Sequence, residues 1–575
     1  MSAGDRAKFS EQTLFLVSGG AGISSMRERY ERWLQILMAV TGFVLLIVCA
    51  NVASLMLVRG MERRRQTSLS MALGAGALRI VRQDLTESML LSVFGGAMGL
   101  AVAFAGTRLI LNFVFPANTG MPGVPIDVSP SLPILLFAFG VSLLVGLAFG
   151  ITPGWIATRT DPVEALRGAS RVTASAGSLP RRALVVLQIG LSLALLSASG
   201  LLTSALHALE TQDFGFEQNR RTVAKINPRL AGYTPAQLSQ LYRRIHDAIA
   251  DIPGVSSTAL CLYSPPGGGW GSFVRVDGQP APGPRDDNSS QWDRVTPGYF
   301  EAIGTPIVKG RSISEEDTAA SRHVAVINEA FARKFFKNED PIGRHFGRTP
   351  EASREFEVIG VAKDARYIAN DIDRPAGPLF FLPEAQADYT KSAGSLFLHD
   401  IVISTRPGAH LSAAEVRQAM ASVDPGVPII SIQTLKEKVD LQFTQQRLTA
   451  RLTSFFGMLA LILASVGLYG VVAYSASRLI GEVGVRIALG ATRGDVVRLV
   501  LKSAIGLIVA GLSIGLPLTF AAGRLLGNQL YGINPYNPAV TITAIVALTL
   551  SALVASIIPA IRASLISPLD VLRAE

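Results

Sequence analysis

The chain has 575 residues, of which 49% are hydrophobic and only 17% are charged, with a mean hydropathy of +0.37. An ordinary soluble domain carries about 25% charged residues, so this composition excludes a purely soluble globular protein. The net charge of +10 does not indicate nucleic acid as a partner, because the basic residues lie between the apolar segments. Two cysteines, Cys49 and Cys261, are too few for a disulfide framework or a metal cluster.

Apolar segments dominate the chain. Seven of them are about 20 residues or longer, the length that a helix needs to cross ~30 Å of hydrocarbon. We expect them to span a membrane, and they lie at 34–58, 88–112, 132–156, 183–206, 452–474, 503–526 and 539–561. The first is too long, and lies too far from Met1, for a cleavable signal peptide.

Lysine and arginine are unevenly distributed among the short loops. The loops 59–82, 157–182 and 475–502 each carry at least five of them, whereas 113–131 and 527–538 carry none. Basic short loops stay in the cytoplasm. We therefore predict a multi-pass membrane protein with these three loops and the C-terminus in the cytoplasm. The long stretch between the fourth and fifth spans is then outside.

That stretch, 207–450, predicts one large extracytoplasmic domain of mixed α/β fold, in one or two subdomains. Runs rich in Val, Ile, Phe and Thr predict strands at 255–262, 323–327, 356–361 and 400–404. Loops are expected at Gly267–Gly269 and Pro280–Arg285.

Two amphipathic helices are expected in the same domain, at Pro235–Ile252 and Ser412–Val423. In the second, Ser412 and Glu415 have the spacing of a capping box. Residues 434–451 are polar and helical in pattern, and we expect them to continue without a break into the fifth span. Such a helix would couple the membrane part rigidly to the extracytoplasmic domain.

The chain also repeats itself. Met71–Ala75 recurs as Ile487–Ala491, an offset of 487 − 71 = 416, and Pro162–Arg167 recurs as Pro568–Arg573, an offset of 568 − 162 = 406. The repeat predicts a duplicated membrane module. Residues 183–575 form a complete unit of one span, a domain and three spans, whereas copy one shows only the three spans. We infer a truncated gene, a misplaced start or a short variant.

Glycine pairs recur at the same place in the two copies, as Gly95-x-x-x-Gly99 and Gly511-x-x-x-Gly515. Small residues four positions apart let membrane helices pack closely. The alternative is that glycine is simply common in membrane helices, but the recurrence favours a packing face. We therefore predict that these four glycines lie at helix–helix contacts.

Catalytic motifs are absent from the sequence. There is no G-x-x-x-x-G-K-[S/T], and Gly19–Gly22 lacks the following lysine, so the chain cannot hydrolyse ATP by itself. We assign no catalytic residue, cofactor or metal ligand. The seven predicted spans contain no Asp, Glu, Lys or His, which argues against ion-coupled transport. Asn51 and Gln188 are the polar residues nearest a span's interior, and we expect them to hydrogen-bond between helices.

The segment Arg478–Arg493, R-x-x-x-E-V-G-V-R-I-A-L-G-A-T-R, resembles the cytoplasmic loop of FtsX/MacB-like ABC transporter permeases. Pro568–Arg573, and Tyr299–Ile303 followed by Gly310-Arg311, fit the same family. With two modules, the chain resembles the duplicated, acidobacterial-type permeases, although it is short at its N-terminus. The resemblance implies four spans per module, a MacB-like periplasmic domain, and mechanotransmission driven by a docked ATPase.

We divide the chain accordingly. The expected parts are an extracytoplasmic remnant and stalk, a first FtsX-like module of three spans, a cytoplasmic linker, a single span, a MacB-like periplasmic domain, and a second FtsX-like module of three spans. They lie at 1–32, 33–168, 169–182, 183–206, 207–450 and 451–575.

The loop of copy two is our candidate site for coupling to an ATPase, through Glu482, Arg486 and Arg493. Where Glu482 and Arg486 stand, copy one has Gln66 and Ser70, and it has therefore lost an i,i+4 pair worth about 0.3–0.5 kcal/mol. The expected partners are a separate ABC ATPase, membrane lipid and a periplasmic adaptor. The alternatives are a non-transporting scaffold or regulator of a periplasmic or cell-wall partner, and a pseudogene-like fragment.

Overall fold

The computed structural model describes most of the chain, in the segments 24–72, 77–114, 132–158, 178–280, 286–337, 339–349, 352–367, 375–390, 394–478, 486, 489, 491–527 and 533–565. The chain divides into two compact units. We call them the helical unit, Ala21–Ala208 with Gln445–Glu575, and the sheet unit, Leu209–Thr444 with Met1–Gly20.

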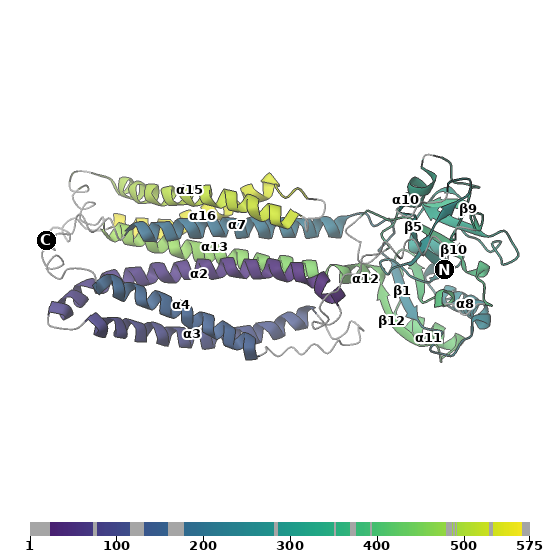
Figure 1. The fold of residues 1–575 in the computed structure, drawn as a ribbon, viewed down its shortest axis with the longest axis horizontal. Coiled ribbons are helices and arrows are strands. Elements are labelled where there is room, and N and C mark those ends of the chain that lie inside the picture. Colours follow the sequence, from purple (N-terminus) through teal and green to yellow (C-terminus); the bar gives the residue numbers. More distant parts are fainter. Residues whose placement is uncertain are drawn as a thin grey trace. The chain divides into compact units, whose positions relative to one another are not determined.

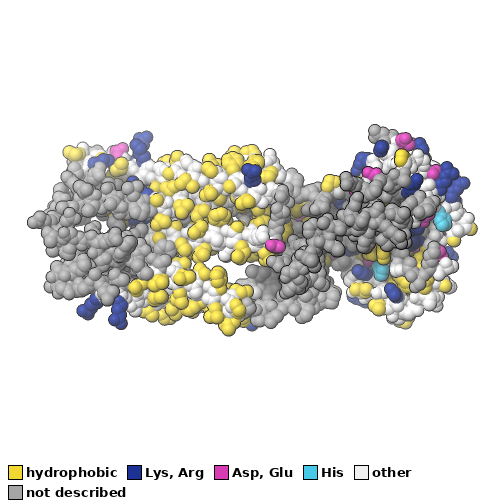
Figure 2. Space-filling model, viewed as in Figure 1, with side chains coloured by type: hydrophobic (Ala, Val, Ile, Leu, Met, Phe, Trp, Pro, Cys, Tyr) yellow, Lys and Arg dark blue, Asp and Glu magenta, His cyan; other side chains and the backbone are white. Residues whose placement is uncertain are grey.

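Long helices lie side by side in the helical unit (Figure 1). They are α2 (Ser24–Ala72), α3 (Ala77–Val114), α4 (Leu132–Thr158), α7 (Ser178–Thr211), α13 (Thr444–Arg478), α15 (Arg493–Leu526) and α16 (Pro538–Ser564). By their described residues, six of these helices are long and apolar enough to cross a membrane. The remaining predicted span, 132–156, falls on α4, whose described apolar stretch Leu132–Leu147 is shorter. In Figure 2, hydrophobic side chains cover much of the described surface of these helices.

Helix α7 forms the centre of this unit. Of its most apolar stretch 72% is buried, against 0% for α3. One side of α7, with Val185, Ile189 and Leu193, shares a hydrophobic core with α13, α15 and α16. Another side, with Leu191 and Leu195, packs with α2 and α13. Because α2 belongs to copy one of the repeat and α13 to copy two, α7 joins the two copies.

The described residues of the sheet unit form one mixed sheet of twelve strands in the order β12-β1-β11-β2-β5-β10-β7-β9-β8-β4, with β3 beside β5 and β6 beside β9. The strands are β1 (Arg221–Ile226), β2 (Val255–Cys261), β3 (Trp270–Phe273), β4 (Arg275–Val276), β5 (Ser289–Val295), β6 (Ile307–Gly310), β7 (Val324–Asn328), β8 (His345–Gly347), β9 (Phe356–Ala362), β10 (Leu379–Pro383), β11 (Asp400–Thr405) and β12 (Ile429–Thr434). The α-helices are α8 (Pro235–Ala250), α9 (Tyr299–Ile303), α10 (Glu329–Phe331), α11 (Ala413–Val423) and α12 (Leu435–Gln442).

Two hydrophobic cores hold this sheet together, so the unit is one sheet with two cores. The first packs α8 and α11 on the sheet, and the second gathers aromatic rings around Phe331, Phe346 and Phe380. The four predicted strands correspond to β2, β7, β9 and β11, and the predicted helices to α8 and α11. The predicted capping box of α11 is also present. The predicted loop Pro280–Arg285 lies mostly outside the described residues.

The helix that we predicted to run unbroken from 434 into the fifth span is interrupted, so that prediction is wrong. Helix α12 ends at Gln442 and α13 begins at Thr444, with Phe443 between them at φ −96° and ψ 6°. The Phe443 ring is 1% exposed and lies 6.1 Å from the ring of Phe214. Burying such a ring gains about 1.5–3 kcal/mol, more than the single backbone hydrogen bond that a continuous helix would add.

Candidate functional site

The glycine pair of copy two lies where α15 crosses α7. A methyl group built on Gly511 would be 2.4 Å from Ile189 Cγ2 and 3.2 Å from Val186 O, and one on Gly515 would be 3.0 Å from Gly190 Cα. In return, a methyl group on Gly190 would be 3.3 Å from Gly511 O and Gly515 N. The two backbones are therefore in van der Waals contact, and glycine is the residue that allows this approach.

The glycine pair of copy one is placed differently. No described atom lies within 4 Å of a methyl group built on Gly95 or Gly99, and both residues are exposed. Helix α3 instead approaches α4 through Gly96, and Gly146 of α4 lies against Ser92. The face that we predicted to pack in copy one is open, because no described helix holds the place on α3 that α7 holds on α15.

A row of polar side chains, which we call the polar seam, joins α2, α7 and α13. It comprises the buried residues Asn51, Ser54, Arg181 and Gln188. Asn51 Nδ2 donates to Leu463 O at 3.2 Å, which confirms the hydrogen bond between helices expected for Asn51. Arg181 Nε donates to Ser54 Oγ at 3.2 Å, and its guanidinium lies 4.8 Å from the centre of the Tyr474 ring. The seam therefore ties both copies to α7.

The seam uses equivalent positions of the two copies. Asn51 matches Gly467 and Ser54 matches Gly470, since 467 − 51 = 416 and 470 − 54 = 416. A methyl group on Gly467 would lie 2.5 Å from Gln188 Oε1 and 2.8 Å from Asn51 Oδ1. A glycine in copy two thus makes room for the polar side chains that copy one and α7 place beside it.

Sequence reasoning missed the role of Arg181, which it counted as a cation of the basic loop 157–182. The structure places Arg181 in α7 with 4% of its surface exposed. Its Nη1 atom and Nε2 of Gln188 have no hydrogen-bond partner among the described residues, and an unpaired buried donor costs about 1–3 kcal/mol. The sequence carries no signal for this burial. The neighbouring Arg182 is the same residue type, and it is exposed.

The predicted coupling loop is described only in part. Glu482 lies outside the described residues, whereas Arg486 and Arg493 are both exposed. The backbone oxygen of Arg486 accepts from Ala491 N at 2.9 Å. Arg493 is the first residue of α15, whose start is fixed by a capping box of Thr492 and Asp495. Both described cations are accessible to a partner, and their role in coupling stays a prediction.

Helix α12 is fixed to the sheet by a buried cluster that we call the anchor: Lys438, Ser264 and Asp400. Lys438 Nζ donates to Ser264 Oγ at 2.5 Å and to Ser264 O at 2.7 Å, and it lies 3.3 Å from Asp400 Oδ2. Ser264 N donates to the same carboxylate oxygen at 2.8 Å. The side chains of Lys438 and Asp400 are only 15% and 7% exposed. The anchor thus holds α12, the last helix of the sheet unit before α13, against β11.

The anchor has the residue types of a serine–lysine nucleophile, but its geometry is structural. Ser264 is 0% exposed, and its hydroxyl donates to Asp400 at 2.5 Å, so no substrate reaches it. In the part of the chain that the structure describes, no group of three or more His, Cys, Asp and Glu could hold a metal ion. Sequence reasoning missed the anchor, because its members lie far apart in the chain and follow no motif.

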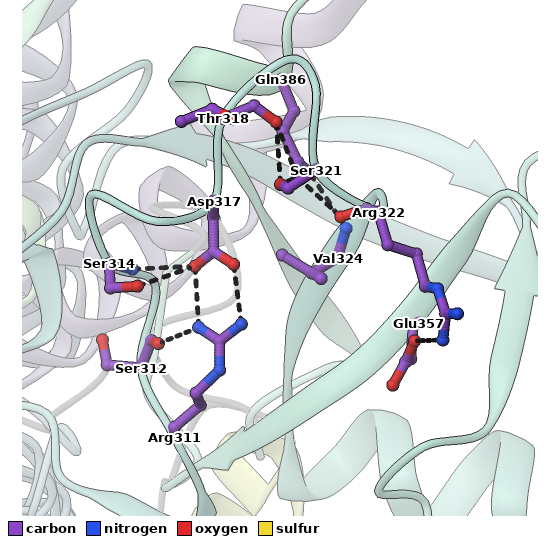
Figure 3. Close-up of polar contacts among 10 residues, drawn as sticks. All are labelled: Arg311, Ser312, Ser314, Asp317, Thr318, Ser321, Arg322, Val324, Glu357 and Gln386. Atoms are coloured by element: carbon purple, nitrogen blue, oxygen red, sulfur yellow. Dashed lines mark hydrogen bonds and ion pairs between the residues drawn. The ribbon is translucent and has the colours of Figure 1, made fainter.

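A second polar cluster orders the loop between β6 and β7 (Figure 3). Arg311 Nη1 and Nη2 donate to the Asp317 carboxylate at 2.8 and 2.7 Å, and Ser314 N donates to it at 2.9 Å. Farther along the loop, the backbone oxygen of Arg322 accepts a hydrogen bond at 2.8 Å from Nε2 of Gln386, a residue that follows β10. Gly310-Arg311, a part of the family resemblance, therefore begins a loop that is held by charge-assisted hydrogen bonds.

Asp317 should make the stability of the sheet unit depend on acid. Burial raises the pKa of Asp317, but the hydrogen bonds from Arg311 and Ser314 outweigh it, so the pKa lies below its ordinary value. A lowered carboxyl pKa stabilises the fold above the unfolded value, near 3.8, and this stabilisation is lost as pH falls through the folded value. We expect Asp317→Asn to cost about 1.5–3 kcal/mol at pH 6, and less near pH 3.

Urea unfolding of a fragment comprising 215–440 at the two pH values measures this difference. We expect the fragment to fold alone, with a cooperative transition and mixed α/β circular dichroism. The matched control is Asp340→Asn, whose carboxylate pairs with Lys309 at the surface, with side chains 60% and 52% exposed, and which should have little effect. Equal losses at pH 6 and pH 3 for Asp317→Asn would show that the ion pair does not cause the effect.

Two known protein families match parts of this chain. Residues 183–420 match the family described as MacB-like periplasmic core domain. Residues 38–162 and, separately, 454–568 match the FtsX-like permease C-terminal family. The second family therefore occurs twice, at the two copies of the internal repeat.

Individual relatives match over shorter stretches. The macrolide export ATP-binding/permease protein MacB of Syntrophobacter fumaroxidans is 37% identical over 133 residues, 23% of this chain and 17% of that protein. MacB of Escherichia coli O157:H7 is 35% identical over 146 residues, 25% of this chain and 21% of that protein. The chain thus spans about a fifth of the length of these curated relatives.

Among solved structures, the periplasmic region of MacB from Actinobacillus actinomycetemcomitans is similar, with 15% identity and a TM-score of 0.28 over 40% of this chain and 95% of that one. The extracellular domain of the transporter YknZ from Gram-positive bacteria gives 14% identity and a TM-score of 0.24, over 37% of this chain and 98% of that one. From the two families that it matches and their order along the sequence, the chain belongs to the FtsX-like permeases, with a duplicated FtsX-like region and a MacB-like periplasmic core domain.

Proposed function

We propose that the chain is the permease subunit of an ABC-type transporter in a bacterial inner membrane, with its basic loops and C-terminus in the cytoplasm. It works with a separate ATPase and converts ATP hydrolysis into motion of the sheet unit, for export or for mechanotransmission. The substrate stays unassigned. Membrane lipid surrounds the helical unit, and a periplasmic adaptor is a further proposed partner of the sheet unit.

The observation that best supports this proposal is the way the two chain connections enter the sheet unit. Phe214 follows α7 and Phe443 precedes α13, and their rings pack together inside the sheet unit at 6.1 Å. The anchor fixes α12 to the sheet immediately before Phe443. A displacement of α13 relative to α7 would therefore strain a buried cluster and act on β11, rather than being absorbed by a loose loop.

The loop of copy two provides the first test. We expect the double variant Glu482→Gln/Arg486→Ser to lose binding of the partner ATPase and stimulation of its turnover. Removing one member of a buried interfacial charge pair costs about 2–5 kcal/mol, which weakens docking by about tenfold or more. The measurement is co-purification of the full chain with an ATPase from the same cells, followed by the ATPase rate in nanodiscs.

The matched control is Arg63→Ala/Arg64→Ala in the copy-one loop, which should keep most of the binding. Equal loss in both variants, or loss in the copy-one variant alone, would refute the asymmetry between the loops. Normal ATPase binding and stimulation in both variants would favour the other candidate, a non-transporting scaffold or regulator.

A further inference from the structure

A cavity of about 500 Å³ lies in the sheet unit, between α9, the start of β6 and the beginning of the loop that follows β6. Its size falls within the range of small-molecule sites, about 300–1,000 Å³. Phe300 and Ile313 line it and are each only 4% exposed, so its inner wall is apolar. Phe300 belongs to the segment Tyr299–Ile303 of the family resemblance, to which the proposed function gives no role.

An ion pair holds one wall of this cavity in place (Figure 3). Ser312 and Ile313, which line the cavity, directly follow Arg311, whose guanidinium donates to both oxygens of the Asp317 carboxylate at 2.8 and 2.7 Å. Arg311 Nη1 also donates to Ser312 O at 3.1 Å. Paired hydrogen bonds between charged groups fix geometry as well as adding energy. The wall is therefore an ordered part of the fold.

Among the described residues that line the cavity, only Glu301 is charged. It is exposed, and its carboxylate forms no hydrogen bond or ion pair with another described residue. Arg221 attracts Glu301 electrostatically, but from beyond ion-pair distance. Cations on the neighbouring segments already have carboxylate partners, in the pairs Arg221–Glu217, Arg311–Asp317 and Lys309–Asp340. The cavity thus combines an apolar wall with a negative charge that no described cation pairs with.

We propose that this cavity binds a small organic cation that has an apolar body and a protonated amine. The apolar body packs against Phe300 and Ile313, and the ammonium group lies beside Glu301. Removing apolar surface from water provides most of the binding free energy, and the carboxylate selects cations over anions of the same shape. Binding needs neither the ATPase nor transport, so the site goes beyond the function proposed above.

The Ser312→Cys variant reports on the cavity in the full chain. It is made after Cys49 and Cys261 are replaced by alanine, and its rate of alkylation by N-ethylmaleimide is measured in nanodiscs of zwitterionic lipid. Three probes share one apolar body: phenylbutylamine is a cation, phenylbutanol is neutral and phenylbutyrate is an anion. We expect phenylbutylamine to slow the alkylation at an about threefold lower concentration than phenylbutanol, the effect of one exposed ion pair, and phenylbutyrate to be the weakest.

Reversing the charge in the cavity decides the role of Glu301. Glu301→Lys should reverse the order of the probes, so that phenylbutyrate protects best, and protection by the anion also shows that the cavity is still formed. The matched control is Glu315→Lys, an exposed acid that does not line the cavity, and it should keep the original order. Equal protection by the three probes, protection by none, an unchanged order in Glu301→Lys, or a reversed order in Glu315→Lys would each overturn the proposal.

Discussion

Replacing Lys438 with methionine should lower the free energy of unfolding of the sheet unit by about 3–5 kcal/mol. The substitution removes the cation from a carboxylate that is only 7% exposed, and it takes two hydrogen bonds from Ser264. Breaking a buried ion pair by deleting one partner leaves an uncompensated charge, which costs more than the pair itself contributed. Urea unfolding of the full chain in detergent, followed by circular dichroism of the sheet unit, measures the loss.

The chain offers a matched control for this variant. Lys436 lies two residues earlier on α12 and is exposed, so Lys436→Met should change stability by less than about 0.5 kcal/mol. Adding Asp400→Asn to Lys438→Met should restore most of the lost stability, because the unpaired charge is then removed. An equal loss for both lysine variants would contradict the role of the anchor. So would a double variant that is less stable to urea than Lys438→Met alone.

The second large effect concerns the contact of α15 with α7. We expect Gly511→Val to destabilise the helical unit by about 3 kcal/mol, which is the upper end of the usual cost of adding carbon atoms to a well-packed core. Even the first carbon of the new side chain would lie 2.4 Å from Ile189 Cγ2 and 3.2 Å from a backbone oxygen, Val186 O. The backbone cannot yield as a flexible side chain does. The apparent melting temperature in detergent should fall by on the order of 5–10 °C.

The equivalent substitution in copy one, Gly95→Val, is the natural control. It changes the same residue at the same place in the repeat, but its methyl groups meet no described atom within 4 Å. We expect no loss of melting temperature from it. If the two variants lowered the melting temperature equally, the two glycine faces would be equivalent in the protein, contrary to the structure.

Much of the fold follows from local patterns. The long apolar runs predict helices, since a backbone in hydrocarbon must satisfy its own hydrogen bonds. The capping box of Ser412 and Glu415 fixes the start of α11 from four consecutive residues. The strands β2, β7, β9 and β11 are rich in β-branched residues, and the central ones are buried on both faces. These features depend on neighbours in the chain, so the sequence displays them.

The features that the sequence could not show depend on contacts between distant residues. The break at Phe443 requires the ring of Phe214, more than 200 positions earlier. The anchor requires Ser264 and Asp400 to meet Lys438. Gly95 and Gly511 have the same local sequence signal, and they differ only because α7 is present beside one of them. A repeat predicts equivalent surfaces, but it cannot predict which of them is occupied.

We propose that ATP hydrolysis by a partner changes the shape of the sheet unit through the anchor. Its most direct test is a pulsed electron spin measurement of the distance between labels at Ser289→Cys and Ser422→Cys, both exposed in the sheet unit. Cys49 and Cys261 are first replaced by alanine. The full chain is reconstituted in nanodiscs with the co-purified ATPase, with and without ATP.

We predict that ATP shifts the distance distribution only when the ATPase is present, and that Lys438→Met abolishes the shift while the ATPase stays bound and active. The Lys436→Met variant should respond like the unaltered chain. A distribution that is the same with and without ATP, in a complex that hydrolyses ATP, would contradict the coupling proposed here.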